Sequence, residues 1–178
     1  MKRQMEIFLG FVFLMMFSTV SISFGQVVNA SVGIAGLSCP FCAYGLEKHL
    51  KKLDGVGEVK IQVNKGLAEL MVKKEGSIAV EQVSDAVKKA GFTPKEITIT
   101  AIGHVGEIKG LPSFEVSDEV SEIDIIFLLD ENAQFEKLKK ALKREQTKVK
   151  VTGKIHKEIQ EGHSGHPYTI VVQSFEIL

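Results

Sequence analysis

The only two cysteines in the 178-residue sequence, Cys39 and Cys42, are three positions apart. They stand in the segment Gly-Leu-Ser-Cys-Pro-Phe-Cys, where Pro40 suits the first position of a helix because it has no backbone N–H to donate. Two thiols at the start of a helix can converge on one soft metal ion or close a short disulfide. The partial positive charge of a helix N-terminus favours the thiolate, which is the form that binds metal. We therefore assign the chemistry of this chain to Cys39 and Cys42.

Three uses of the cysteine pair are open on chemical grounds: metal binding, thiol–disulfide exchange with Cys39 as the exposed nucleophile, and a structural disulfide. The sequence C-P-F-C is also a redox motif of the glutaredoxin type. A thioredoxin-like fold, however, continues with a βα unit and a cis-proline strand, whereas no proline occurs between Pro40 and Pro94. Metal binding is therefore the preferred use. Two thiolates favour Cu(I) or Hg(II), while Zn(II) usually takes four ligands.

The first 25 residues have the pattern of a secretory signal peptide. Lys2 and Arg3 precede an apolar run over residues 7–20 and a short stretch of small and polar residues. We expect cleavage before Gln26, and the alternative is an uncleaved membrane anchor. The apolar run has roughly 14 residues, fewer than the ~20 that a membrane span needs. The sequence thus predicts a protein exported to the periplasm or the cell exterior, with no stable membrane insertion after cleavage.

Composition excludes several classes of function. The 22 basic residues balance the 22 acidic ones, so the net charge gives no sign of a nucleic-acid-binding surface. No nucleophile and base stand at a motif spacing, and the glycine-rich stretch over residues 103–110 lacks the spacing of a phosphate-binding loop. We therefore expect that the protein is not an enzyme. With two cysteines only, its folding must depend on hydrophobic cores rather than on a disulfide framework.

Hydrophobic periodicity predicts a βαββαβ order in the first half of the chain, with two helices packed on one antiparallel sheet. The first helix has Cys42, Leu46, Leu50 and Leu53 on its inward stripe. The predicted strands are residues 27–34, 56–63, 67–72 and 92–100, and the predicted helices are 41–53 and 77–90.

These residues resemble the heavy-metal-associated domain, which occurs in copper chaperones, metal-pumping ATPases and the periplasmic mercury-binding protein. The resemblance covers Val27 to about Ile99 and implies a ferredoxin-like sandwich with Cys39 and Cys42 as the metal ligands. It further implies that Phe92 is an aromatic residue packed near the loop. The family usually has Met at the position of Leu37, which can fill the same apolar slot. The resemblance rests on the cysteine segment, the apolar stripe after it, Asp54-Gly55-Val56 and Ala90-Gly91-Phe92.

The signal-peptide pattern, the two thiolates and the resemblance together indicate an exported carrier that captures a soft metal ion, with Cu(I) as the leading candidate and Hg(II) or Zn(II) as alternatives. Its partner would be a metal transporter or another metal-binding protein, whose thiolates replace Cys39 and Cys42 one at a time. The alternative functions are a periplasmic thiol–disulfide oxidoreductase and a non-catalytic interaction module whose cysteines form a structural disulfide.

The sequence predicts three parts: a signal peptide over residues 1–25, the ferredoxin-like domain over 26–96, and a small β-barrel domain over 97–178. The alternative is that the fourth strand of the ferredoxin-like domain runs on into the third part. The third part resembles an OB-fold domain through the order of its elements alone. It holds 10 basic and 13 acidic residues and few aromatics, so nucleic-acid binding is not expected. We expect it to act as a docking or spacer module. Its predicted strands are residues 97–108, 114–116, 122–129, 148–156 and 168–177, with a helix over 133–144.

A second metal site is conceivable in a glycine-rich loop near the C-terminus. There, His163 and His166 with Glu161 could form an open site for Cu(II), Zn(II) or Ni(II), because imidazole suits those ions. A turn with solvated histidines is the preferred interpretation. The remaining histidines are expected to be packed or solvated rather than ligands: His49, His104 and His156.

Overall fold

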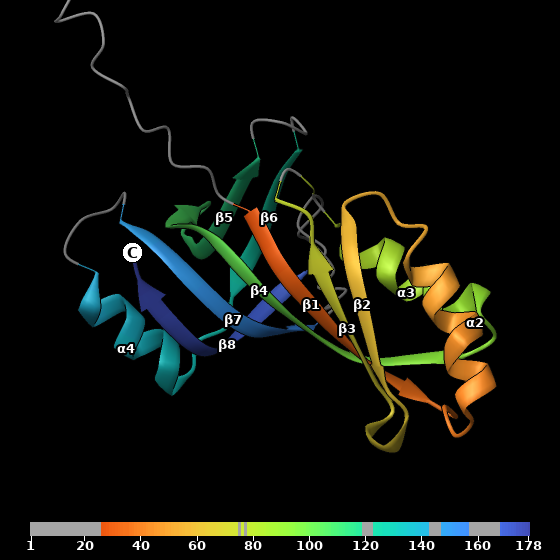
Figure 1. Ribbon diagram of the computed structural model, residues 1–178. Helices are drawn as coiled ribbons and strands as arrows, with labels where there is room; N and C mark the ends of the chain where they lie inside the picture. Colours follow the sequence, from red (N-terminus) through yellow and green to blue (C-terminus); the bar gives the residue numbers. More distant parts are fainter. Residues whose placement is uncertain (1–25, 75, 77, 119–122, 143–146, 157–167) are drawn as a thin grey trace, which may run out of the picture.

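The computed structural model describes residues 26–74, 76, 78–118, 123–142, 147–156 and 168–178 (Figure 1). The predicted signal peptide and the predicted second metal site at Glu161, His163 and His166 lie outside the described residues.

The first half of the chain forms a four-stranded antiparallel sheet in the order β2-β3-β1-β4, with two helices against one face (Figure 1). This is the predicted βαββαβ arrangement, and it confirms the ferredoxin-like part of the fold. The elements are β1 (Gln26–Ala35), α2 (Pro40–Leu50), β2 (Val56–Gln62), the 3-10 helix η1 (Val63–Lys65), β3 (Leu67–Val72), α3 (Val80–Lys89) and β4 (Thr93–Ile108).

Helix α2 buries Ala43, Leu46 and Leu50 against the sheet. The prediction that Cys42 lies on this inward stripe is wrong: Cys42 is exposed, because the buried stripe is Ala43, Leu46 and Leu50, at the helical spacing i, i+3, i+7. The helix also ends three residues before Leu53. Its last turn tightens there, since the N–H groups of residues 52 and 53 bond to carbonyls three residues back rather than four.

Helix α3 begins at Val80, three residues later than predicted, and buries Val83, Ala86 and Val87. Gly91 follows the C-cap residue Ala90 with a φ of 87°, a left-handed conformation that favours glycine. The next N–H, of Phe92, bonds to the carbonyl of Val87 and satisfies the helix end. The predicted stop at Gly91 is confirmed, and it directs the chain into β4.

Strand β4 is shared by the two halves of the molecule. Over its first ten residues one edge pairs with β1, and over residues 97–104 the other edge pairs with β7 (Lys148–His156). Its last five residues pair with β5 (Leu111–Asp118). The predicted boundary between residues 96 and 97 thus falls inside one continuous strand, so the sheet runs without a break from one half into the other.

The second half is a closed five-stranded barrel in the order β4-β5-β6-β8-β7, closed by the pairing of β7 with β4. Strand β6 (Ile123–Leu129) runs parallel to β8 (Thr169–Ile177), and the other pairs are antiparallel. Helix α4 (Ala133–Ala141) lies between β6 and β7 in sequence, as predicted. The Asn132 side chain caps it by accepting from two backbone N–H groups at 2.9 and 2.8 Å, and donates to the carbonyl of Val172 at 3.0 Å.

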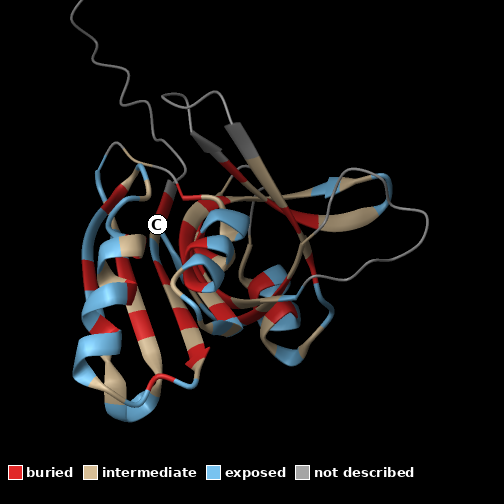
Figure 2. Ribbon diagram, turned by 90° about the vertical axis from the view of Figure 1, so that its right-hand side faces the viewer, coloured by how far each residue is buried: buried red, intermediate tan, exposed pale blue. Residues whose placement is uncertain are grey.

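One hydrophobic cluster extends through both halves (Figure 2). It includes Leu46 and Val87 from the helices of the first half and Phe114, Phe127 and Leu138 from the second, all fully buried. Because the cluster is continuous and β4 belongs to both halves, we expect the two halves to stabilise one another. Among the described residues, no helix is both long and apolar enough to cross a membrane.

Candidate metal centre

The loop that carries the cysteines connects the end of β1 to the start of α2. Gly36 has a φ of 81°, which turns the chain out of the strand. Leu37 then enters the core and is only 6% exposed. This confirms the expectation that Leu37 fills an apolar slot, and the loop is anchored on the core directly before Cys39.

Cys39 and Cys42 lie together at the N-terminus of α2. The structure pairs them as a disulfide, with their Cα atoms 5.3 Å apart. Cys39 is the N-cap residue, and its Sγ accepts a hydrogen bond from the backbone N–H of Cys42 at 3.2 Å. Pro40 occupies the first helical position, as predicted. The sequence thus places both sulfur atoms at the positive end of a helix dipole.

The two cysteines differ in exposure. Cys42 is exposed, whereas Cys39 is half-buried. The interpretation of Cys39 as the exposed member of the pair is therefore wrong. The physical reason is its role as a cap: Cys39 precedes the helix and its side chain turns back over the first turn, while Cys42 lies on the outer side of that turn.

Two exposed aromatic side chains lie next to the cysteine pair in the sequence. Phe41, between the two cysteines, is 87% exposed, and Tyr44 is 60% exposed. The Nζ atom of Lys48 lies 4.6 Å from the centroid of the Tyr44 ring, a cation–π contact. A partner that docks on this turn of α2 would therefore meet exposed aromatic side chains and a positive charge close in sequence to the sulfur atoms.

The neighbouring segments fix the base of the loop. Ile34 donates its backbone N–H to the carbonyl of Gly66 at 2.7 Å, and Ala35 pairs with Thr93 at the start of β4. Gly66 has a φ of 58°, and a Cβ there would lie 2.8 Å from the Ile34 carbonyl oxygen, so glycine is needed for this close approach. Phe92 is partly buried against the core. Its position near the cysteine loop stays a prediction.

The histidines in the described part of the chain lie away from one another in sequence and on different elements. His49 is half-buried on α2, where it lines a hollow between the two helices with Lys52 and Asp85. His104 is half-buried on β4, and His156 is exposed at the end of β7. Within the described ranges, no three or more His, Cys, Asp or Glu side chains are grouped as a metal site would require.

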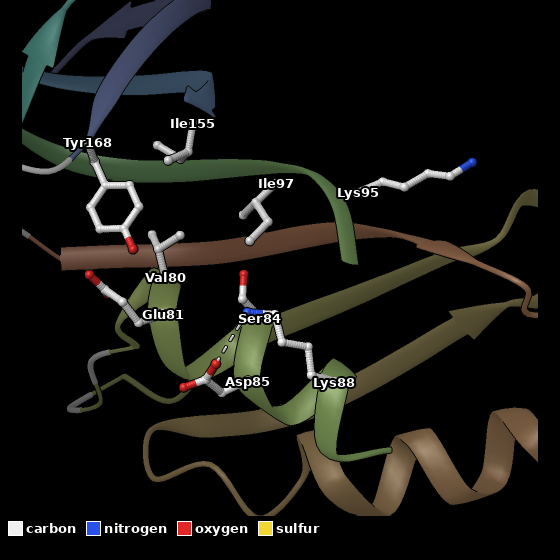
Figure 3. Close-up of a pocket in the computed structure, with 9 residues that line it drawn as sticks. All are labelled: Val80, Glu81, Ser84, Asp85, Lys88, Lys95, Ile97, Ile155 and Tyr168. Atoms are coloured by element: carbon white, nitrogen blue, oxygen red, sulfur yellow. Dashed lines mark ion pairs between the residues drawn. The ribbon is translucent and has the colours of Figure 1, made fainter. Parts of the chain in front are cut away.

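A cleft of about 410 Å³ lies between α3 and the barrel (Figure 3). Tyr168, just before β8, faces Glu81 of α3 across it, and its hydroxyl donates a hydrogen bond to that carboxylate. Burial raises the pKa of Tyr168, and the nearby negative charges of Glu81 and Asp85 raise it further. No local sequence pattern predicts this cleft, because its walls come from segments about 80 residues apart. It joins the two halves and contains no cysteine.

Comparison with known proteins places the similarity in the first half of the chain. The family model of the heavy-metal-associated domain matches residues 31–93. The chain is 28% identical over 69 residues to the copper chaperone CopZ of Staphylococcus haemolyticus, which covers 39% of this chain and all of that protein.

Solved structures match over the same region. The N-terminal domain of a potential copper-translocating P-type ATPase from Bacillus subtilis is 26% identical, covering 39% of this chain and 86% of that one, with a TM-score of 0.35. The mercury-bound periplasmic protein MerP of the bacterial mercury detoxification system is 22% identical, covering 40% and 94%, with a TM-score of 0.33. By sequence match and by the position of its cysteine loop, the segment 31–93 of this chain is a heavy-metal-associated domain.

Proposed function

We propose that this protein is an exported, non-enzymatic carrier of a soft metal ion, with Cu(I) as the leading cargo and Hg(II) or Zn(II) as alternatives. The observation that carries the proposal is the loop itself. It holds two sulfur atoms side by side at a helix N-terminus, on a surface that a partner can reach. The match of residues 31–93 to the heavy-metal-associated domain and their similarity to a copper chaperone support it.

The reduced pair supplies two thiolates, and soft ions such as Cu(I) and Hg(II) prefer that ligand type. The helix dipole and the N–H of Cys42 stabilise negative charge at Cys39. The exposed Cys42 is then the ligand that a partner thiolate displaces first, and the anchored Cys39 is displaced last. Such stepwise exchange never leaves the ion without a ligand, so tight binding is compatible with fast transfer.

The partner is a metal transporter or another metal-binding protein that presents its own thiolates. Phe41 and Tyr44 offer it apolar contact area next to the sulfurs. The barrel acts as a docking or spacer module, and we infer that it is of the OB type. Its closed strand order, the helix between its third and fourth strands and the parallel contact of β6 with β8 support that inference.

Metal stoichiometry of the reduced protein tests the proposal. We expect one Cu(I) per chain in equilibrium dialysis with a competing chelator, and no stoichiometric binding in the Cys39→Ser/Cys42→Ser double variant. Ser31→Ala, a substitution on the outer face of β1, serves as the control that keeps both cysteines. If the double variant still binds one ion, the cysteines are not the ligands and the proposal fails.

Thiol–disulfide exchange is the second candidate, and the pairing of Cys39 with Cys42 as a disulfide favours it. An oxidoreductase would turn over a disulfide substrate many times per chain with a supply of reductant. A carrier would bind metal stoichiometrically and show no such turnover. Reduction of insulin disulfides, followed by turbidity, separates these two functions.

A further inference from the structure

The two sulfur atoms of the disulfide are not equivalent, and this asymmetry determines how the bond can be opened. A disulfide is reduced when a thiolate attacks one sulfur and the other sulfur leaves as a thiolate. The rate depends on access to the attacked sulfur and on how well the leaving sulfur carries negative charge. In this loop both conditions select the same direction of attack.

Access selects Cys42 as the attacked sulfur. Cys42 is exposed and lies on the outer side of the first turn of α2, whereas Cys39 is half-buried and caps the helix. Between Gly36 and Leu46 the sequence contains no charged side chain, so no carboxylate in this segment repels an incoming thiolate. The first acidic residue along the helix, Glu47, forms an ion pair with Lys51 at 2.6 Å.

Charge stabilisation selects Cys39 as the leaving sulfur. Its Sγ accepts the hydrogen bond from the N–H of Cys42 at 3.2 Å, and it lies at the positive end of the α2 dipole. A thiolate released at Cys39 is therefore stabilised where it forms. Both sulfur atoms lie at the positive end of α2, so the hydrogen bond from the N–H of Cys42 is what distinguishes the sulfur of Cys39 from that of Cys42.

We propose that Cys42 is the site of mixed-disulfide formation with a dithiol protein reductant. The reductant's thiolate attacks the Sγ of Cys42, a new S–S bond forms, the bond between Cys39 and Cys42 breaks, and Cys39 leaves as a thiolate. The reductant's second thiolate then attacks its own sulfur in the mixed disulfide and releases Cys42 as a thiolate. Two electrons pass to this chain, and the reductant departs as a disulfide.

This step would come before metal capture, because only the reduced pair supplies two thiolates. It does not depend on the proposed function, since the direction of attack follows from the loop whether or not the reduced pair binds metal. The reaction that must prepare this protein for any thiolate chemistry is thus a dithiol–disulfide exchange that enters at Cys42.

Trapping the intermediate tests the proposal. The oxidised full-length protein is pulsed with reduced glutathione, quenched with acid, blocked with N-ethylmaleimide, and mapped by mass spectrometry. We expect glutathione on Cys42 and maleimide on Cys39 in about tenfold excess over the reverse arrangement. Equal labelling, or glutathione mainly on Cys39, would overturn the proposal.

Two further experiments test the same preference for Cys42 with a protein reductant and with a loop variant. A thioredoxin variant that retains only its attacking cysteine replaces glutathione, and its cross-link is expected at Cys42 as well; a cross-link at Cys39 would contradict the proposal. Phe41→Ala tests whether the adjacent ring directs the attack, and we expect the same preference for Cys42, because Phe41 is 87% exposed. A reversed preference in this variant would show that the ring, rather than access and charge, selects the sulfur. Because the label is read without metal, failure of the metal assay leaves this outcome unchanged.

Discussion

The two halves of this molecule share strand β4, but they differ in how their characteristic features are distributed along the sequence. In the first half, the seven residues from Gly36 to Cys42 contain a turn, an anchor, a cap and both sulfur atoms. In the barrel, no comparably short segment of the described chain gathers reactive side chains. Its defining features are pairings between distant strands, such as β4 with β7.

The cysteine loop is local in sequence, but its position depends on a strand that also belongs to the barrel. The cysteine loop is held by Ala35, which pairs with Thr93 at the start of β4, and the same strand continues into the barrel wall. Disturbing the barrel should therefore affect the cysteine loop, although no barrel side chain needs to touch a sulfur atom. Glycine substitutions in each half test this dependence most directly.

The largest effect is expected from Gly103→Ala in β4. A Cβ at this position would lie 2.2 Å from the carbonyl oxygen of Glu115, and backbone atoms on a paired strand cannot easily move away. We expect a loss of about 3 kcal/mol or more in the free energy of unfolding, measured by urea denaturation. Since β4 and the core are shared, the amides of α2 should lose hydrogen-exchange protection by a similar amount.

Gly45→Ala is the matched control for this substitution. Gly45 lies within α2, and a Cβ there would meet no atom within 4 Å. Because alanine is the better helix former, this variant should gain up to about 1 kcal/mol. If Gly103→Ala left the protection of α2 intact, the halves would unfold independently and the shared strand would not couple them.

A smaller effect on the free energy of unfolding is expected within the cysteine loop, where a buried side chain and an exposed one should differ. Leu37→Ala removes a side chain that is 6% exposed beneath the loop, and should lower the free energy of unfolding by about 2–4 kcal/mol. Phe41→Ala removes a side chain that is 87% exposed, and should change it by no more than about 0.5 kcal/mol. Thermal unfolding followed by circular dichroism measures both. Equal losses would mean that Phe41 packs in the folded protein.

Local patterns predicted most elements in both halves, because period and turn chemistry depend on neighbouring residues. The stop at Gly91 follows from its left-handed φ, and the strand at Lys148–His156 matches its prediction residue for residue. The orientation of the first turn of α2 was not predictable in this way. Cys42 fits the helical spacing of the inward stripe, yet Ala43 is buried in its place.

Two further features depend on long-range pairing, which sequence patterns do not report. The patterns predict two overlapping strands, 92–100 and 97–108, and leave open that the first runs on into the second half. The structure has the single strand β4, and periodicity does not report which partners a strand has on its two edges. The cleft that joins Glu81 to Tyr168 likewise exists only once the barrel has closed. The cysteine site was predictable because its parts are adjacent in the chain.

The smallest effect concerns the contact across that cleft, and it depends on pH. Burial raises the pKa of Tyr168, so the folded protein holds this proton more tightly than the unfolded chain does. Its contribution to stability is therefore complete below the ordinary tyrosine pKa of about 10 and is lost as the pH rises above that value. Urea denaturation at pH values from about 8 to about 11, a range that brackets this pKa, measures the effect. The free energy of unfolding should fall more steeply with rising pH in the wild type than in Tyr168→Phe.

Tyr44→Phe, at an exposed position on α2, should keep the wild-type slope, because its hydroxyl does not face the cleft. Parallel curves for the wild type and Tyr168→Phe would mean that the cleft does not hold the hydroxyl in the folded protein, and that β4 and the shared core alone join the two halves.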